Sequence, residues 1–291
     1  MSTLTRSRRG LKPRRSPLLT SVMVLFLIYT VVPLAWLVMS ATKTQGDLFS
    51  SPGLWFGDHF SLFSNIHKTL TYRDGIFLRW LRNTVLYVVL GAGGATVLAT
   101  AGGYGLAKYR FRGRRAVFAV ILGALAIPGT ALAVPTFLMF SRVGLTNTVW
   151  AIIIPSLVSP FGLYLIWVYA VEAVPHELME AARIDGAGEF RIFTTVALRL
   201  LAPGIVTVLL FSVVAVWNNY FLPLIMLSDS SLYPLTVGLT QWSAQAQGVG
   251  AEPIYNLVIT GSVLTIVPLV AVFFLLQRFW QSGLSAGSVK Q

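Results

Sequence analysis

The 291-residue sequence is 55% hydrophobic and only 11% charged, and its 22 basic and 10 acidic residues give a net charge of +12. Soluble domains carry about 25% charged residues, so this composition excludes an ordinary soluble domain and a disordered chain. The absence of cysteine also excludes a disulfide scaffold, a thiolate nucleophile, an Fe–S cluster and Cys-ligated zinc. The sequence therefore predicts an integral membrane protein.

Stretches without charge predict where the chain crosses the membrane. A helix needs about 20 apolar residues to cross the ~30 Å hydrocarbon core of a bilayer. Six stretches are long enough and contain no Asp, Glu, Lys, Arg or His: Ser16–Thr42, Asn83–Ala107, Ala116–Ser141, Val143–Val171, Leu200–Ser228 and Pro253–Gln277. Such long runs differ from the alternating segments of about 10 residues in a barrel. We expect an all-α integral membrane protein with six transmembrane helices.

The distribution of basic residues predicts the orientation of the chain. Sixteen of the 22 Lys and Arg residues lie before the first span, between spans two and three, between spans four and five, or after the last span. Cytoplasmic segments of membrane proteins carry such an excess. We expect a multi-pass membrane protein with both termini in the cytoplasm.

The chain is therefore expected to consist of five parts. A cytoplasmic N-terminal tail is expected at 1–16, a first transmembrane helix at 17–42 and an extracytoplasmic loop at 43–81. A core of five helices is expected at 82–277 and a cytoplasmic C-terminal tail at 278–291.

Two other interpretations of the basic residues are weaker. Binding of nucleic acid would require cations grouped with aromatic residues in a soluble module, whereas here they flank apolar spans. The segment Ser7–Lys12 is similar to a twin-arginine export signal. The apolar run that follows is too long for a signal peptide, so we expect a retained helix.

The spans lack the groups that chemistry or ion coupling would require. Ion-coupled transporters and pumps place titratable side chains inside the bundle, and none occurs in the six stretches. The three histidines, His59, His67 and His176, lie in predicted loops. We therefore expect no catalytic residue, no metal site and no cofactor, and a conduit that takes its energy from another polypeptide.

Small residues recur at four-residue spacing in the second span, at Gly91, Ala95, Ala99 and Gly103. Small residues one turn apart allow helix backbones to approach closely in lipid. This pattern favours close helix packing over a sliding gate.

The later spans combine helix breakers with polar side chains. Prolines interrupt spans three to six, which suits either a translocation pathway or simple kinks. Span five also contains Trp217, Asn218, Asn219 and Tyr220. Amides suit the hydroxyl groups of a sugar and aromatic rings suit its faces, so we expect these four residues to line the substrate pathway. A static hydrogen bond between helices is an equally good explanation of the two amides.

The longest inner loop, Glu172–Arg199, is the most charged part of the chain between two spans. Pro175 and the acids Glu177 and Glu180 suit the first turns of a helix, and the glycines of Asp185–Gly188 suit a break. A second helix is expected to carry Phe190, Phe193 and Ala197 on one face. Two short helices of this kind either dock on a cytoplasmic partner or rest on lipid.

This loop resembles the EAA loop of ABC importer permeases, written E-A-A-x3-G-x9-I-x-L-P. The matching residues are Glu180, Ala181, Ala182, Gly186, Val196 and Leu198. Val196 replaces the usual Ile, and Arg199 stands where the family has Pro. The resemblance implies the type I ABC importer fold (ABC transmembrane type-1) over 82–277. It also implies that the coupling loop, 172–199, meets a partner ATPase through Glu180, Ala181, Ala182, Asp185 and Gly186.

Two further segments narrow the resemblance. Trp217–Leu224 is similar to the W-N-x-[FY]-x-x-P-L stretch of carbohydrate-uptake permeases, and Gly283–Lys290 is similar to their terminal G-L-x-x-G-A-V-K. Both imply the shorter permease of the pair in maltose and glycerol-phosphate importers. The implied partners are a sister permease in a heterodimer, a dimer of ATP-binding subunits and an extracytoplasmic solute-binding protein.

The function that follows is import of a sugar or oligosaccharide by ATP-driven alternating access, with the chain itself not an enzyme. A passive channel or an ion-coupled secondary transporter for a small polar solute is the alternative. A channel would not need the coupling loop, and a secondary transporter would need an intramembrane titratable group.

Overall fold

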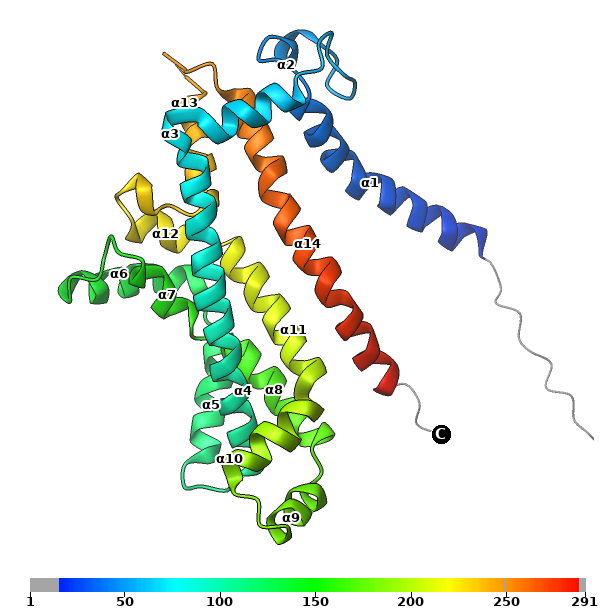
Figure 1. Ribbon diagram of the computed structural model, residues 1–291, viewed down its shortest axis with the longest axis vertical. Coiled ribbons are helices and arrows are strands. Elements are labelled where there is room, and N and C mark those ends of the chain that lie inside the picture. The colour runs from blue at the N-terminus through cyan, green and yellow to red at the C-terminus, as the bar shows by residue number, and fades with distance from the viewer. Residues whose placement is uncertain (1–15, 249, 288–291) are drawn as a thin grey trace, which may run out of the picture.

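The computed structural model describes residues 16–248 and 250–287, and the side chains up to residue 277. The predicted N-terminal tail at 1–16 lies almost wholly outside the described residues, as does the end of the terminal motif at 288–290. All regular secondary structure of the described residues is helical (Figure 1). They are α1 (Pro17–Ala41), α2 (Asp47–Ser50), α3 (Leu62–Tyr87), α4 (Gly93–Lys108), α5 (Arg114–Leu125), α6 (Ala133–Arg142), α7 (Trp150–Ser156), α8 (Pro160–Ala173), α9 (His176–Ile184), α10 (Glu189–Arg191), α11 (Leu198–Trp217), α12 (Phe221–Met226), α13 (Leu235–Gln245) and α14 (Tyr255–Gly287).

Five helical stretches are long and apolar enough to cross a membrane: Pro17–Ala41, Leu62–Lys108, Trp150–Ala173, Glu189–Trp217 and Tyr255–Gln277. Two further helices, Arg114–Leu125 and Gly129–Arg142, are bent by 101° relative to each other at Pro128. They form a sixth membrane span if the bent pair is counted as one. Proline lacks a backbone N–H and disfavours helical geometry in the residue before it, which explains the bend. The chain is an all-α integral membrane protein, as the sequence predicts.

The second span begins earlier than its charge-free stretch. Helix α3 starts at Leu62 but is kinked at Tyr72–Gly75, where the backbone is not helical. The part after the kink continues through a π-helical turn at Val88–Ala92 into α4, so helix occupies much of the stretch expected as a loop at 43–81. Arg79 and Arg82 are exposed on the outer face of α3, whereas Phe77 and Trp80 are both 1% exposed. A search for charge-free runs stops at such arginines although the helix does not.

The fifth span also has different bounds. Helix α10 continues through a π-helical segment, Ile192–Ala197, into α11 without a break. The second loop helix is therefore the start of span five, and Arg199 lies inside it where a proline would have disturbed the helix. The predicted common face is wrong, because Phe190 is 80% exposed while Ala197 is fully buried.

The small-residue stripe of the second span packs directly on α8. A side-chain carbon added at Gly103 would lie 2.7 Å from the carbonyl oxygen of Leu163 and 2.8 Å from the side chain of Ile166. Residues of α4, α8, α9 and α11 form one buried cluster around this crossing. The prediction of close helix packing is confirmed.

Gly103→Ala is expected to lower the melting temperature of the purified protein, because its methyl group would push a backbone carbonyl away. Overpacking of this kind costs about 1–3 kcal/mol. Gly105→Ala is the matched control, since nothing lies within 4 Å of a carbon added there and alanine favours helix by up to about 1 kcal/mol. Equal melting temperatures for the two variants would contradict the packing argument.

A second cluster is aromatic and joins α3, α11, α13 and α14. It contains Phe77, Trp80, Trp217 and Trp242, and the rings of Trp80 and Trp242 are 4.9 Å apart. Gly238 of α13 faces the ring of Trp80 at a distance that leaves no room for a side chain. This cluster fixes the end of α11 against α3 and α13.

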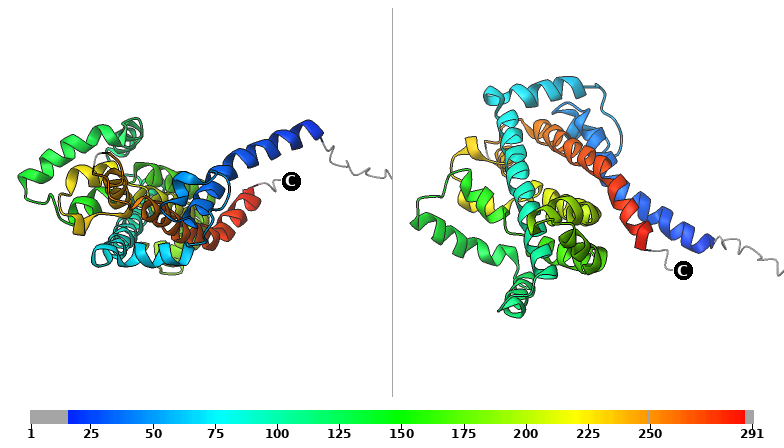
Figure 2. Two further views of the ribbon diagram at one scale, coloured as in Figure 1. Left: turned by 90° about the horizontal axis from the view of Figure 1, so that it is seen from above. Right: turned by 60° about the horizontal axis from the view of Figure 1, so that its bottom comes forward.

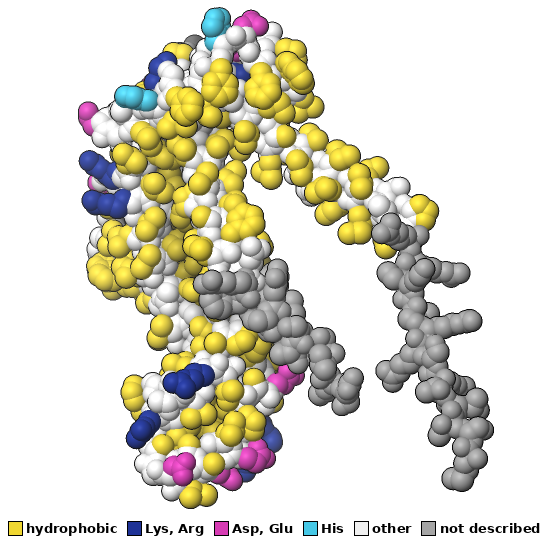
Figure 3. All heavy atoms as spheres, turned by 45° about the vertical axis from the view of Figure 1, so that its right-hand side comes forward, with side chains coloured by type: hydrophobic (Ala, Val, Ile, Leu, Met, Phe, Trp, Pro, Cys, Tyr) yellow, Lys and Arg dark blue, Asp and Glu magenta, His cyan; other side chains and the backbone are white. Residues whose placement is uncertain are grey.

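The first helix stands apart from the rest of the chain. Helix α1 is exposed along nearly all its length, with only Ser40 and Ala41 buried, and it packs mainly on α14. Figures 1 and 2 show it on the opposite side of the molecule from α6. Figure 3 shows hydrophobic side chains along the middle of the molecule, with charges of both signs at the end that carries α9 and α10. An apolar surface of this size is suited to lipid or to another membrane subunit.

Candidate functional site: a projecting helix and an open groove

Helix α9 projects from one end of the bundle and ends in a complete glycine cap. Gly186 has φ +79°, the left-handed conformation that glycine adopts without strain. The amide of Gly186 donates to the carbonyl of Arg183 (3.0 Å), and the amide of Ala187 donates to that of Ala182 (2.9 Å). These are the two bonds of a Schellman motif, so the glycine of the EAA pattern ends the helix at a fixed residue.

Buried contacts anchor α9 on α4. Met179 is 1% exposed and lies in the cluster around the α4–α8 crossing. Its sulfur accepts a hydrogen bond from the Tyr104 hydroxyl at 3.9 Å, and the ring of Tyr104 lies 5.0 Å from that of Phe193. One side of α9 is thereby held against the bundle.

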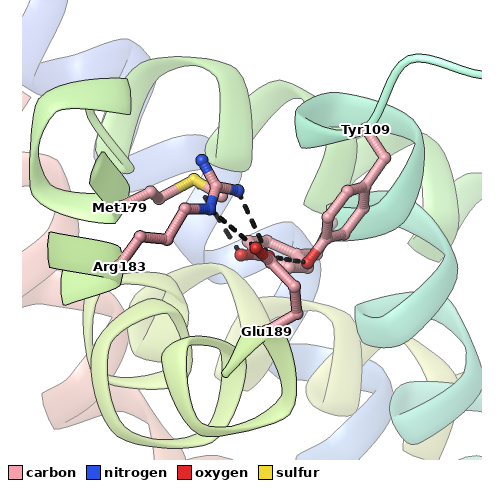
Figure 4. A network of polar contacts seen from close by, with 5 residues as sticks. Tyr109, Met179, Arg183 and Glu189 are labelled. Atoms are coloured by element: carbon pink, nitrogen blue, oxygen red, sulfur yellow. Dashed lines mark hydrogen bonds and ion pairs between the residues drawn. The ribbon is translucent and has the colours of Figure 1, made fainter. Parts of the chain in front are cut away.

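A polar network connects α9 to the start of α10 and to the residue that follows α4 (Figure 4). The Glu189 carboxylate accepts hydrogen bonds from Arg183 Nε (2.6 Å) and Arg183 Nη2 (3.2 Å). It also accepts one from the Tyr109 hydroxyl (2.8 Å). Burial and the hydrogen bond to Glu189 raise the pKa of Tyr109, so its hydroxyl keeps the proton that it donates.

The predicted coupling residues lie together at this end of the molecule. Glu180, Ala181, Asp185 and Gly186 are exposed, whereas Ala182 is half-buried and packs on the core. They form one turn of α9 and its cap, as their spacing predicts.

Three large apolar side chains beside this turn are exposed and were not identified from the sequence as site residues. Leu178 is 46% exposed, Ile184 87% and Phe190 80%. Exposed apolar side chains at such an end of the molecule are suited to contact with another protein or with lipid.

The four predicted pathway residues lie at the break between α11 and α12, but they have different surroundings. Trp217 is 6% exposed and belongs to the aromatic cluster. The amide of Asn218 donates to the carbonyl of Val214 (2.9 Å) in its own helix. The backbone carbonyl of Asn219 accepts from the Thr236 hydroxyl (2.7 Å). The Asn218 bond stays within its own helix, and the Asn219 bond uses the backbone. Neither is the hydrogen bond between an amide side chain and another span that the sequence allowed.

Tyr220 borders an open groove of about 360 Å³ between α12, α13 and α14. The other lining residues are Thr236, Leu239, Thr240, Ser262, Thr265 and Ile266. Four of them carry hydroxyl groups, and none is charged. Sequence reasoning missed these residues because they come from helices far apart in the chain.

Among the residues that the structure describes, no three His, Asp or Glu side chains come together in a way that could hold a metal ion.

A membrane-spanning helical bundle with the glycine-capped helix α9 at one end is the arrangement that the resemblance to ABC importer permeases implies. Residues 95–285 match the family described as the binding-protein-dependent transport system inner membrane component. The chain belongs to this family.

Curated relatives are similar over nearly their whole length. The permease protein AraQ of the arabinooligosaccharide transport system of Halalkalibacterium halodurans is 30% identical, covering 97% of this chain and 99% of AraQ. NgcG of the diacetylchitobiose uptake system of Streptomyces coelicolor is 30% identical, covering 93% of this chain and 87% of NgcG. LacG of the lactose transport system of Rhizobium radiobacter is 30% identical, covering 93% and 94%. The resemblance to carbohydrate-uptake permeases is confirmed.

The fold is that of a solved importer. A chain in the crystal structure of a bacterial ABC transporter involved in the import of the acidic polysaccharide alginate superposes with a TM-score of 0.81 and 21% identity. The match covers 92% of this chain and all of that chain. The expected type I ABC importer fold is confirmed, and a passive channel or secondary transporter is not favoured.

Proposed function

We propose that this chain is the shorter permease subunit of a binding-protein-dependent ABC importer that moves an oligosaccharide by ATP-driven alternating access. The observation that carries the proposal is helix α9, which ends at Gly186 and presents exposed apolar side chains beside the EAA turn. A channel or an ion-coupled transporter has no use for such a surface. The chain itself is not an enzyme, since ATP is hydrolysed by the partner.

The proposed assembly has four kinds of subunit. A sister permease forms a heterodimer with this chain, a dimer of ATP-binding subunits docks on α9 and its cap, and an extracytoplasmic binding protein delivers the solute. Both termini and α9 are then cytoplasmic in the bacterial inner membrane, which agrees with 16 of the 22 Lys and Arg residues lying in the segments on that side.

In the proposed cycle, ATP closes the two ATP-binding subunits and moves α9 with them. Because α9 is packed on α4 and faces the start of α11, its displacement tilts both spans and rocks the bundle between inward- and outward-facing states. The sugar passes the α11–α12 break, where Tyr220 and the hydroxyl groups of α13 and α14 border the groove.

The proposed solute is an oligosaccharide because the named relatives belong to transport systems for arabinooligosaccharides, diacetylchitobiose and lactose. Trp217 supports the walls of the pathway from the aromatic cluster, while Asn218, Asn219 and Tyr220 form the break itself.

The test is the dependence of uptake on the ATP-binding subunits. Vesicles that contain the complete importer should take up radiolabelled sugar only with ATP inside and binding protein outside. Uptake that persists in vesicles lacking the ATP-binding subunits would show a channel or a secondary transporter instead.

Tyr220→Ala is expected to lower sugar uptake about fivefold or more, because the variant loses a ring and a hydroxyl group at the groove; one lost hydrogen bond alone is about 1 kcal/mol. Phe221→Ala is the matched control, since Phe221 is a neighbouring exposed aromatic residue that does not line the groove. Initial rates of uptake at equal membrane content provide the measurement. Equal loss in both variants would place the sugar elsewhere.

A further inference from the structure

One carboxylate joins three elements at the α9 end of the molecule. Arg183 comes from α9, Glu189 is the first residue of the helix that becomes span five, and Tyr109 directly follows α4, the end of span two. Glu189 accepts three hydrogen bonds from the other two residues at 2.6–3.2 Å. Nothing in the EAA pattern includes Glu189 or Tyr109.

This network contributes little to the stability of the fold. The side chains of Arg183 and Glu189 are 41% and 47% exposed, and ion pairs in water contribute little because solvent screens them. Its geometry is nevertheless restrictive, since a guanidinium that donates twice to one carboxylate fixes the direction of both side chains. The network therefore acts on orientation rather than on folding.

The connection from α9 to α10 needs such a restraint. It consists of Asp185–Gly188, with glycine at two of its four positions, and glycine is the residue whose backbone bends most easily. Met179 holds α9 on α4 through Tyr104 and shares a buried cluster with Ile192 and Ala197 at the start of span five. These apolar contacts are not directional, so the orientation of α9 across the glycine turn depends on the side-chain bonds of Arg183 to Glu189. The Arg183–Glu189 ion pair connects the helices on the two sides of this turn.

We propose that Glu189 is a positioning residue that makes α9, the start of span five and the end of span two move as one body when the ATP-binding subunits close. The inference rests on the proposed function, because it takes the movement of α9 to be driven by ATP. Arg183 transmits the movement to Glu189, and Tyr109 extends it to span two.

The test uses spin labels, since the chain has no cysteine of its own. Cysteines introduced at His176 on α9 and Thr195 at the start of span five, both exposed, carry the labels in the assembled importer. Their separation is measured by pulsed electron spin resonance without nucleotide and with ATP and vanadate. In the wild type, the distance between the two labels should have one narrow distribution, the same without nucleotide and with ATP and vanadate.

In Glu189→Ala the distance should become broad and should shift when ATP and vanadate are added, while the ATP-binding subunits stay attached and hydrolyse ATP. Arg191→Ala is the control: Arg191 is an exposed cation two residues from Glu189, with no ion pair among the described residues. It should behave like the wild type. The exchange Arg183→Glu with Glu189→Arg restores opposite charges and should narrow the distance again, which a lost packing contact would not do.

A Glu189→Ala importer with the same narrow distance in both states would overturn the inference. So would an Arg191→Ala importer that broadens equally. Failure of the proposed function has a different signature, because the wild-type chain would then not bind ATP-binding subunits at all.

Discussion

Gly186→Val is expected to reduce ATP-driven uptake by about tenfold or more, within the usual range of coupling between distant sites, while the chain still inserts in the membrane. Gly186 has φ +79°, and a β-branched residue in this conformation costs about 1–2 kcal/mol. Nothing lies within 4 Å of a carbon added there, so the whole effect comes from the backbone. The cap opens, and the end of α9 no longer has a fixed position.

A comparison with Gly188 isolates this cause. Gly188 lies two residues further along the same exposed turn, also with nothing within 4 Å, but its φ is −72°. Valine adopts that conformation without strain, so Gly188→Val should retain uptake. Gly186→Asn should lose less than Gly186→Val, because asparagine tolerates the left-handed region.

Uptake, ATP hydrolysis and membrane content are measured for all three variants. Loss of uptake with hydrolysis retained is the expected result for Gly186→Val. If Gly188→Val were as damaging, bulk at the surface rather than the backbone of the cap would explain the loss.

The sequence predicted best those features that depend on a single strong physical constraint. Charged residues are excluded from hydrocarbon, so charge-free runs locate the spans. Only glycine fits a left-handed helix cap without strain, so the spacing of Gly186 from Glu180 predicts where α9 ends. Both kinds of information are local and can be read from a few residues.

Features that depend on packing were predicted less well. The first turns of span two, after the kink in α3, were missed because Arg79 and Arg82 are exposed while Phe77 and Trp80 join the core. Trp217 was assigned to the pathway from its residue type, and its burial in the aromatic cluster could not be read from the sequence.

The groove and the polar network could not be predicted from the sequence for a different reason. The groove combines Tyr220 with hydroxyl groups from α13 and α14, and Tyr109 lies 80 residues before Glu189. No local pattern marks such pairs, because only the packing of the helices brings them together.

Ile184→Asp and Phe190→Asp are each expected to weaken binding of the ATP-binding subunits by about 30-fold or more, the effect of losing a central apolar residue from an interface. Ile184 is 87% exposed and Phe190 80% exposed, so neither supports the fold of the isolated chain. Their melting temperatures should equal that of the wild type, as is usual for surface substitutions.

Thr195→Asp is the matched control, because Thr195 is exposed near Phe190 and its hydroxyl bonds only the carbonyl of Arg191. Co-purification of the ATP-binding subunits with the tagged chain gives the measurement, repeated at several subunit concentrations. Binding that survives both aspartates would mean that the two side chains rest on lipid, the other surface that suits exposed apolar residues beside a membrane span. Loss with Thr195→Asp as well would indicate a general effect of negative charge rather than a docking surface centred on α9 and its cap.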